Sequence, residues 1–168
     1  MRPSWQETYF EIAKIVAKRS KDPHTQVGAI LVKNGCVIGI GYNGEPRNFK
    51  YEFDWNSDEK YTYVIHAELN AIANACSIGA NVTGSDIYLT MSPCKDCIKL
   101  LIQHQIKNIY YLKDYKDIEI VKQIATNSTT NLEKFIDINK LPCLKCEWRY
   151  SMHCPKCDWN KDGHVKTY

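Results

Sequence analysis

The sequence predicts an α/β protein, a three-layer α/β/α sandwich with a mixed sheet of about five strands. Short apolar runs and helical patterns alternate along most of the chain, which is typical of this class. The first two apolar runs are joined by Asn34 and Gly35, a strong hairpin signal, and are therefore expected to pair antiparallel. The later runs are separated by helical segments, and such crossovers leave their strands parallel.

The predicted elements follow one another in a regular order. Ser4 and Glu7 form a capping box that begins a helix over residues 5–19. The continuous apolar run 27–32 is typical of a buried strand, and residues 45–63 form a long polar and aromatic loop of the kind that often carries function. The remaining predicted elements are the hairpin partner strand over 36–44, a helix from residue 67 that ends at Gly79, a strand over 86–91, a helix over 94–102, a strand over 106–112, a helix over 117–125 and a strand over 132–138.

The chain of 168 residues suits one compact domain with a small appendage, predicted as residues 1–140 and 141–168. Its hydrophobic fraction of 44% is ordinary for a globular protein, and no apolar run approaches the roughly 20 residues of a membrane span. The N-terminus has no apolar leader segment, so we expect a cytoplasmic protein. The formal charge of +3 suits a small anionic ligand and does not by itself indicate binding of long nucleic acid.

One stretch of the chain contains a set of metal ligands. His-Ala-Glu begins at His66 and Pro-Cys-Lys-Asp-Cys ends at Cys97, an order typical of zinc-dependent nucleobase deaminases. One imidazole and the thiolates of Cys94 and Cys97 supply the three ligands of a catalytic zinc that keeps a fourth position open for water. Glu68 is then better suited to carry a proton than to be a fourth ligand. Taken alone, the two cysteines also fit a redox pair or half of a structural site.

The local sequence predicts how these ligands are presented. Ser92 can cap a helix whose first residue is Pro93, which places Cys94 and Cys97 on the first turn, facing the same way. Backbone N–H groups at that end of a helix favour thiolates. His66 is expected just before its helix, because residues two apart do not share a helix face.

Six of the eight cysteines fall in three C-x-x-C pairs, which in a reducing compartment favours metal sites over disulfides. The two pairs in the tail are Cys143, Cys146, Cys154 and Cys157. Four thiolates can close a structural zinc site, in which His153 or His164 is an alternative ligand to one cysteine. Cys36 and Cys76 lie in apolar patterns and are predicted to be buried in the core.

Longer blocks of sequence resemble the deoxycytidylate (dCMP) deaminase family: R-S-K-D-P-H-T-Q-V-G-A, G-I-G-Y-N-G-E-P, Y-V-I-H-A-E-L-N-A-I and S-P-C-K-D-C. The resemblance runs from about Trp5 to Ile138. It implies the cytidine deaminase-like fold and the zinc-dependent hydrolytic deamination of dCMP to dUMP, which feeds thymidylate synthesis. It also implies a homo-oligomer, commonly a hexamer, with dCTP as activator, dTTP as inhibitor and Mg²⁺ accompanying the triphosphate.

The resemblance extends to individual residues. It implies the roles already given to Glu68 and the three ligands. For the substrate, it implies that Asn43 binds the deoxyribose 3′-hydroxyl, that the backbone at Ala67 helps to read the base, and that Tyr115 lies near the phosphate. The candidate cationic partners of the phosphate are Lys21, His24 and Arg47.

Two features depart from the family pattern. Asn48 stands where many members have glycine, in a region that resembles the effector-binding loop, and the Cys-rich tail lies outside the resemblance. One alternative function is therefore a polynucleotide or tRNA deaminase that holds nucleic acid with the tail, although the modest net charge argues against it. A second alternative is a non-catalytic scaffold with two structural zinc sites. Glu68 argues against the scaffold, because a closed structural site needs no proton carrier.

Overall fold

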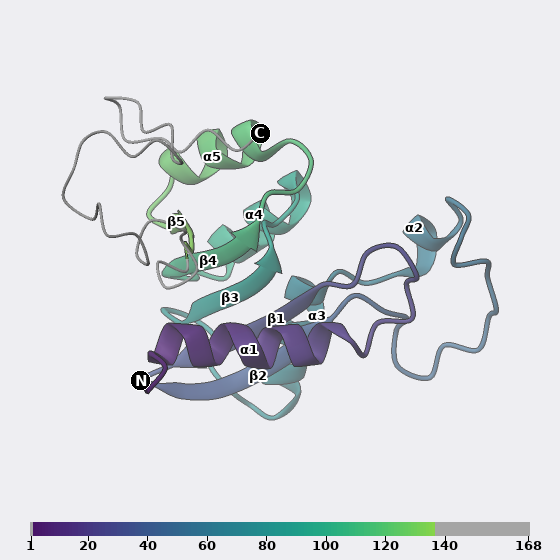
Figure 1. Ribbon diagram of the computed structural model, residues 1–168, viewed down its shortest axis with the longest axis horizontal. Coiled ribbons are helices and arrows are strands. Elements are labelled where there is room, and N and C mark those ends of the chain that lie inside the picture. The colour runs from purple at the N-terminus through teal and green to yellow at the C-terminus, as the bar shows by residue number, and fades with distance from the viewer. Residues whose placement is uncertain (1, 137–168) are drawn as a thin grey trace, which may run out of the picture. The chain divides into compact units, whose positions relative to one another are not determined.

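The computed structural model describes residues 2–136, which form a five-stranded mixed sheet and five helices (Figure 1). The strands are β1 (Gly28–Lys33), β2 (Cys36–Tyr42), β3 (Asp86–Met91), β4 (Asn108–Lys113) and β5 (Asn131–Lys134). The helices are α1 (Trp5–Ala17), α2 (Lys60–Tyr63), α3 (Ala67–Ser77), α4 (Lys95–Gln103) and α5 (Ile118–Thr126).

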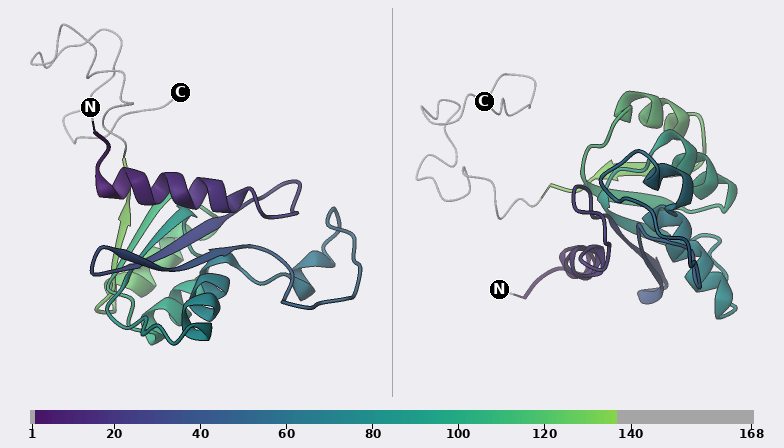
Figure 2. Two further views of the ribbon diagram at one scale, coloured as in Figure 1. Left: turned by 90° about the horizontal axis from the view of Figure 1, so that it is seen from below. Right: turned by 90° about the vertical axis from the view of Figure 1, so that its right-hand side faces the viewer.

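The sheet has the strand order β2-β1-β3-β4-β5. Strand β1 pairs antiparallel with both β2 and β3, whereas β3, β4 and β5 run parallel to one another. Helix α1 packs on one face against residues such as Ile30 and Tyr88, and α3, α4 and α5 pack on the other face against residues such as Leu31 and Leu89 (Figure 2). These three layers around a mixed sheet confirm the predicted fold class.

Several local predictions are confirmed. The Ser4 hydroxyl accepts a hydrogen bond from the Glu7 N–H (3.2 Å) and the Glu7 carboxylate accepts one from the Ser4 N–H (2.6 Å), so the capping box begins α1. Asn34 and Gly35 have φ angles of 51° and 78°, the pair of positive values that a tight hairpin requires. Gly79 has a φ of 75° just beyond α3, as expected of a helix-ending glycine.

Other predictions are wrong in detail. Cys36 and Cys76 are exposed, because Cys36 begins β2 beside the turn and Cys76 faces outward on the last turn of α3. The last four residues of the predicted loop 45–63 form the short helix α2. Strand β5 ends at Lys134, before the predicted limit of 138.

Residues 1–135 form one compact unit. Within the part of the chain that the structure describes, no helix is both long and apolar enough to cross a membrane. The predicted boundary after residue 140 and the tail with Cys143, Cys146, Cys154 and Cys157 lie outside the described residues.

Strand β2 and helix α3 approach each other closely at two glycines. A Cβ atom added to Gly41 would lie 2.3 Å from both the Ala67 carbonyl oxygen and the Ala71 nitrogen, and one added to Gly39 would lie 2.7 Å from the Ala71 carbonyl oxygen. These distances are far below van der Waals contact, so only glycine permits the approach. Because Ala67 is the first residue of α3, the contact sets the position of the helix start.

We therefore expect Gly41→Ala to lower the free energy of unfolding by about 1–3 kcal/mol, because the strand and the helix must separate. The change is measured by urea denaturation. Val37→Ala, at an exposed position of the same strand, is the control and is expected to change stability by less than about 0.5 kcal/mol. Equal denaturation midpoints for Gly41→Ala and the unaltered protein would contradict the close contact.

Candidate active site

The structure brings together the three predicted metal ligands from the beginnings of two helices. The His66 Nδ1 atom lies 3.6 Å from the Cys94 Sγ atom and 3.3 Å from the Cys97 Sγ atom. All three ligand atoms lie within 4.8 Å of one another. A tetrahedral zinc with ordinary bond lengths to nitrogen and sulfur separates these atoms by about 3.5 Å. The set therefore fits a zinc ion in its observed arrangement.

His66 occupies the predicted position before α3. It is the N-cap residue, with extended backbone angles (φ −69°, ψ 153°), so its side chain is not constrained to the helix surface. Glu68 follows in the first helical turn and is 5% exposed. The change from extended to helical backbone at Ala67 thus allows His66 and Glu68, two residues apart, to face the same site.

The beginning of α4 differs from the prediction. Ser92 is not the N-cap and Pro93 is not the first helical residue, because Cys94 itself is the N-cap. Its Sγ atom accepts a hydrogen bond from the Cys97 N–H (3.4 Å), since a sulfur with thiolate character can take the acceptor role predicted for Ser92. The Ser92 hydroxyl instead accepts a hydrogen bond from the Tyr115 N–H (2.8 Å). The serine therefore ties the start of α4 to the segment that follows β4.

Protons are unevenly shared among the ligands. The hydrogen bond between the two cysteine side chains, with the Cys97 thiol as donor, lowers the pKa of Cys94 to about 3, although burial opposes this shift. The same contact, followed by burial, raises the pKa of Cys97, and the contact with Cys94 raises the pKa of His66. One anionic sulfur among three converging donors attracts a divalent cation, which replaces the protons that the ligands otherwise share.

Glu68 has no counterpart in a structural zinc site. Burial is the largest effect on its carboxyl group and raises its pKa to about 6, while the nearby His66 charge acts in the opposite direction. A carboxyl group with this pKa can both accept and release a proton near neutral pH.

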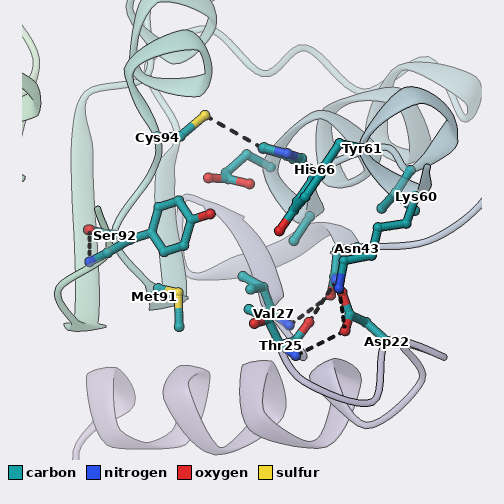
Figure 3. A pocket seen from close by; sticks show the side chains of 14 residues that line it. Asp22, Thr25, Val27, Asn43, Lys60, Tyr61, His66, Met91, Ser92 and Cys94 are labelled. Carbon is teal, nitrogen blue, oxygen red and sulfur yellow. Dashed lines mark hydrogen bonds and ion pairs between the residues drawn. The ribbon is translucent and has the colours of Figure 1, made fainter. Parts of the chain in front are cut away.

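A cavity of about 670 Å³, counted with the open solvent at its mouth, lies beside these residues. In Figure 3 Cys94 and His66 lie in the upper part of the cavity, Asn43 and Asp22 lie below them on the right, and Lys60 reaches from the right toward Asp22. The cavity can thus accept an elongated ligand with one end at the metal ligands.

Three of the predicted substrate contacts line this cavity: Asn43, Ala67 and Tyr115. The Asn43 side chain is held by the backbone of the segment before β1. Its Oδ1 atom accepts a hydrogen bond from the Val27 N–H (2.8 Å), and its Nδ2 atom donates one to the Thr25 carbonyl oxygen (2.8 Å). These bonds fix the amide orientation and leave one N–H and one lone pair for a ligand.

The other three predicted contacts do not line the cavity. Lys21 pairs with Glu45 at 2.8 Å, Arg47 donates to the Asn74 side chain at 2.5 Å, and His24 is exposed. Their contact with a phosphate group stays a prediction.

Sequence reasoning missed two charged residues of the cavity, Asp22 and Lys60. They form a buried ion pair although they are 38 positions apart in the chain. In the sequence Lys60 follows Asp58 and Glu59 within the predicted loop 45–63, and such a charge cluster is typical of an exposed segment. Its local pattern carries no signal of burial, so only the fold reveals it.

The loop that carries Lys60 is closed at its base. Gly44 and Ile65 exchange two backbone hydrogen bonds, of 3.1 Å and 2.8 Å, in an isolated antiparallel bridge. This bridge holds the end of the Asn43 segment next to the residue before His66.

Comparison with known proteins agrees with this geometry. Residues 3–113 match the family described as the cytidine and deoxycytidylate deaminase zinc-binding region, which is well over half of the chain. The chain belongs to this family. The matched range contains the three candidate metal ligands, His66, Cys94 and Cys97, and also Glu68.

Individual proteins that are similar to this chain have more specific names. It is 39% identical over 115 residues to the probable deoxycytidylate deaminase of Caenorhabditis elegans (64% of this chain, 57% of that protein). It is 43% identical over 124 residues to the deoxycytidylate deaminase of Mus musculus (68% of each chain). The chain thus spans between 57% and 68% of the length of these two relatives.

Among solved structures, the dCMP deaminase of the cyanophage S-TIM5 in complex with dCMP and dUMP superimposes with a TM-score of 0.69 at 32% identity. The match covers 80% of this chain and 99% of the phage protein.

The raised pKa of Glu68 predicts a pH-dependent stability of the metal-free protein. The neutral carboxyl group is favoured in the folded state, so its contribution is complete below its usual pKa of 4.5 and is lost as the pH rises through about 6. Above that pH the buried charge costs about 2 kcal/mol. We expect Glu68→Gln to stabilise the metal-free protein by about this amount at pH 7.5 and hardly at all at pH 4.5.

Urea denaturation of chelator-treated protein at the two pH values measures this difference. Glu119→Gln, at an exposed position on α5, is the control and is expected to have no such effect at either pH. An equal gain for Glu68→Gln at both pH values would contradict the buried-charge explanation.

Proposed function

We propose that this chain is a cytoplasmic enzyme that catalyses the zinc-dependent hydrolysis of dCMP to dUMP and ammonia, supplying dUMP for thymidylate synthesis. The observation that carries the proposal is the buried Glu68 carboxyl group beside a His-Cys-Cys cluster, at the wall of a cavity that His66, Glu68 and Cys94 line. The cluster fits zinc, and the carboxyl group supplies the acid–base function that hydrolysis of an amidine requires.

The relatives support the choice of substrate. Two proteins that are 39% and 43% identical to this chain are named deoxycytidylate deaminases, the former as a probable one. The cyanophage enzyme with the same fold was solved in complex with dCMP and dUMP, which are the proposed substrate and product.

The proposed mechanism gives each side chain a defined task. His66, Cys94 and Cys97 would hold the zinc ion, which would lower the pKa of a bound water to about 7. Glu68 accepts a proton from the attacking water and delivers it to N3 of the cytosine ring. Glu68 then takes the remaining proton of the attacking water and passes it to the amino group, which departs as ammonia. Its pKa of about 6 suits both steps, because neither protonation state is strongly favoured near neutral pH.

The remaining contacts orient the nucleotide. We propose that the free N–H and lone pair of Asn43 bind the deoxyribose 3′-hydroxyl, and that the backbone at Ala67 contacts the base. Tyr115 lies in the cavity wall and is fixed through the Ser92 hydroxyl, which suits contact with the substrate phosphate.

Family resemblance also supports a homo-oligomer regulated by triphosphates. We propose dCTP as activator and dTTP as inhibitor, each bound with Mg²⁺. Asn48, in the region that resembles the effector loop, has a φ of 61°, a backbone conformation that glycine adopts readily. The Asn48 backbone is therefore compatible with the glycine that the family resemblance implies at this position.

The acid–base role of Glu68 is tested with zinc-loaded protein. Glu68→Gln is expected to lower kcat/KM for dCMP by about 100- to 10,000-fold, the usual range for loss of a general acid–base, while zinc content is retained. Loss of the cytosine ultraviolet absorbance follows the reaction, and Glu119→Gln is the control. Full activity of Glu68→Gln would overturn the assignment.

The same assay in the presence of dCTP or dTTP with Mg²⁺ tests the proposed regulation. No response to either triphosphate would remove regulation from the proposal.

We further propose a structural zinc site in the tail, formed by Cys143, Cys146, Cys154 and Cys157, because four thiolates can close a tetrahedral site. Metal analysis of the full chain is then expected to give about two zinc ions per chain. Replacing the four tail cysteines with serine is expected to leave about one, as is replacing Cys94 and Cys97. An unchanged zinc content after the tail substitutions would refute the second site.

A further inference from the structure

The ion pair between Lys60 and Asp22 has no role in the mechanism above. The Lys60 Nζ atom lies 3.0 Å from Oδ2 and 3.2 Å from Oδ1 of Asp22. The two side chains are 9% and 6% exposed, and both line the cavity. The five other ion pairs among the described residues have at least one side chain that is more than one third exposed.

Stability does not explain such a pair. Removing two charges from water costs several kcal/mol per ion, and apolar replacements of buried pairs are often neutral or stabilising. The cavity wall around the pair contains apolar side chains such as Val27 and Val64, so an apolar pair would suit the local packing. A function in ligand binding accounts for the buried charges.

The contacts of Asp22 show which partner of the pair is available to a ligand. Its Oδ1 atom also accepts hydrogen bonds from the backbone N–H groups of His24 (2.9 Å) and Thr25 (3.1 Å). The carboxylate is thus fixed in the loop and its charge is largely compensated. The Lys60 ammonium group has three N–H donors, and among the described residues the two oxygens of Asp22 are its hydrogen-bond acceptors. One donor remains for the cavity.

The position of Lys60 matches one end of a nucleotide. The Lys60–Asp22 pair lies beside Asn43, the proposed sugar contact (Figure 3), so its ammonium group would be within reach of the phosphate of a nucleotide whose base lies at the metal ligands. Lys60 is the only lysine or arginine among the described residues that line the cavity. The ammonium group also lies 5.5 Å from the centre of the Tyr61 ring, which limits its rotation.

We propose that Lys60 binds the 5′-phosphate of the substrate and that Asp22 positions its ammonium group. This inference rests on the proposed function, since it concerns the same cavity, and it replaces the exposed Lys21, His24 and Arg47 as the cationic partner of the phosphate. A lysine held by a carboxylate presents its charge at a fixed point, so the cavity selects a nucleotide over the uncharged nucleoside.

The test compares dCMP with deoxycytidine, which lacks the phosphate. In zinc-loaded protein, Lys60→Met is expected to lower kcat/KM for dCMP by about 10- to 100-fold, as expected for loss of a hydrogen bond to a charged group, and to change that for deoxycytidine by less than about threefold. Lys122→Met is the matched control, because it removes an exposed lysine that pairs with Glu119 outside the cavity. Equal loss for both substrates, or no loss for either, would overturn the proposal.

A double variant separates ligand binding from folding. Lys60→Met alone leaves an unpaired buried carboxylate and is expected to be less stable, whereas Lys60→Met with Asp22→Asn removes both charges. If the lysine binds phosphate, the double variant regains stability but still fails to prefer dCMP. Recovery of the preference together with stability would show a purely structural pair. Asp22→Asn alone is expected to weaken the preference partly, and Lys60→Arg to restore part of it.

A direct binding measurement separates this proposal from the proposed function. Calorimetry with dUMP and deoxyuridine applies even if neither dCMP nor deoxycytidine is deaminated, a result that would sink the proposed function. Weaker dUMP binding by Lys60→Met, by about 10-fold or more with deoxyuridine binding unchanged, supports the phosphate contact. The proposal is overturned if Lys60→Met binds dUMP as tightly as the unaltered protein. It is also overturned if Lys21→Met, and not Lys60→Met, selectively loses dUMP binding.

Discussion

The contact between strand β2 and helix α3 determines where the chemistry of this protein takes place. At Gly39 and Gly41 the two backbones are closer than any side chain would allow, and the first residue of the helix, Ala67, lies in this contact. The helix start therefore cannot slide along the sheet. His66, just before it, and Glu68, just after it, are fixed at the edge where β3 delivers Cys94 and Cys97. The metal ligands thus converge where the starts of α3 and α4 meet.

The sequence predicted the ligand cluster because zinc chemistry restricts both the residue types and their spacing. It also predicted the fold class, since hairpin and crossover signals are local. The predicted cap of α4 was wrong because propensity favours Ser92, whereas the lowered pKa of Cys94 gives its sulfur the acceptor character that a cap needs. The local sequence could not predict contacts between residues that are far apart in the chain. One example is the hydrogen bond from the Tyr115 N–H to the Ser92 hydroxyl.

The charged residues of the cavity show the same limit more clearly. Lys21, which lies beside Asp22 in the chain and stays a predicted phosphate contact, pairs with Glu45 at the surface. Lys60, in a stretch that looked like a solvated loop, is buried instead. Whether a lysine is exposed or buried depends on the path of the chain around it, which no local periodicity encodes. Cys36 and Cys76 were predicted to be buried but are exposed, because apolar neighbours in the sequence do not bury a residue at the end of an element.

The bridge between Gly44 and Ile65 separates the loop between these residues from the segments that hold Asn43 and His66. Its two hydrogen bonds join the ends of the intervening loop, so residues can be inserted or deleted within it while Asn43 and His66 keep their places. The metal ligands and Glu68 lie outside this loop, whereas Lys60 and Tyr61 lie inside it. Exchange of this single segment would thus alter the cavity wall at Lys60 and Tyr61 while the metal ligands and Glu68 keep their positions.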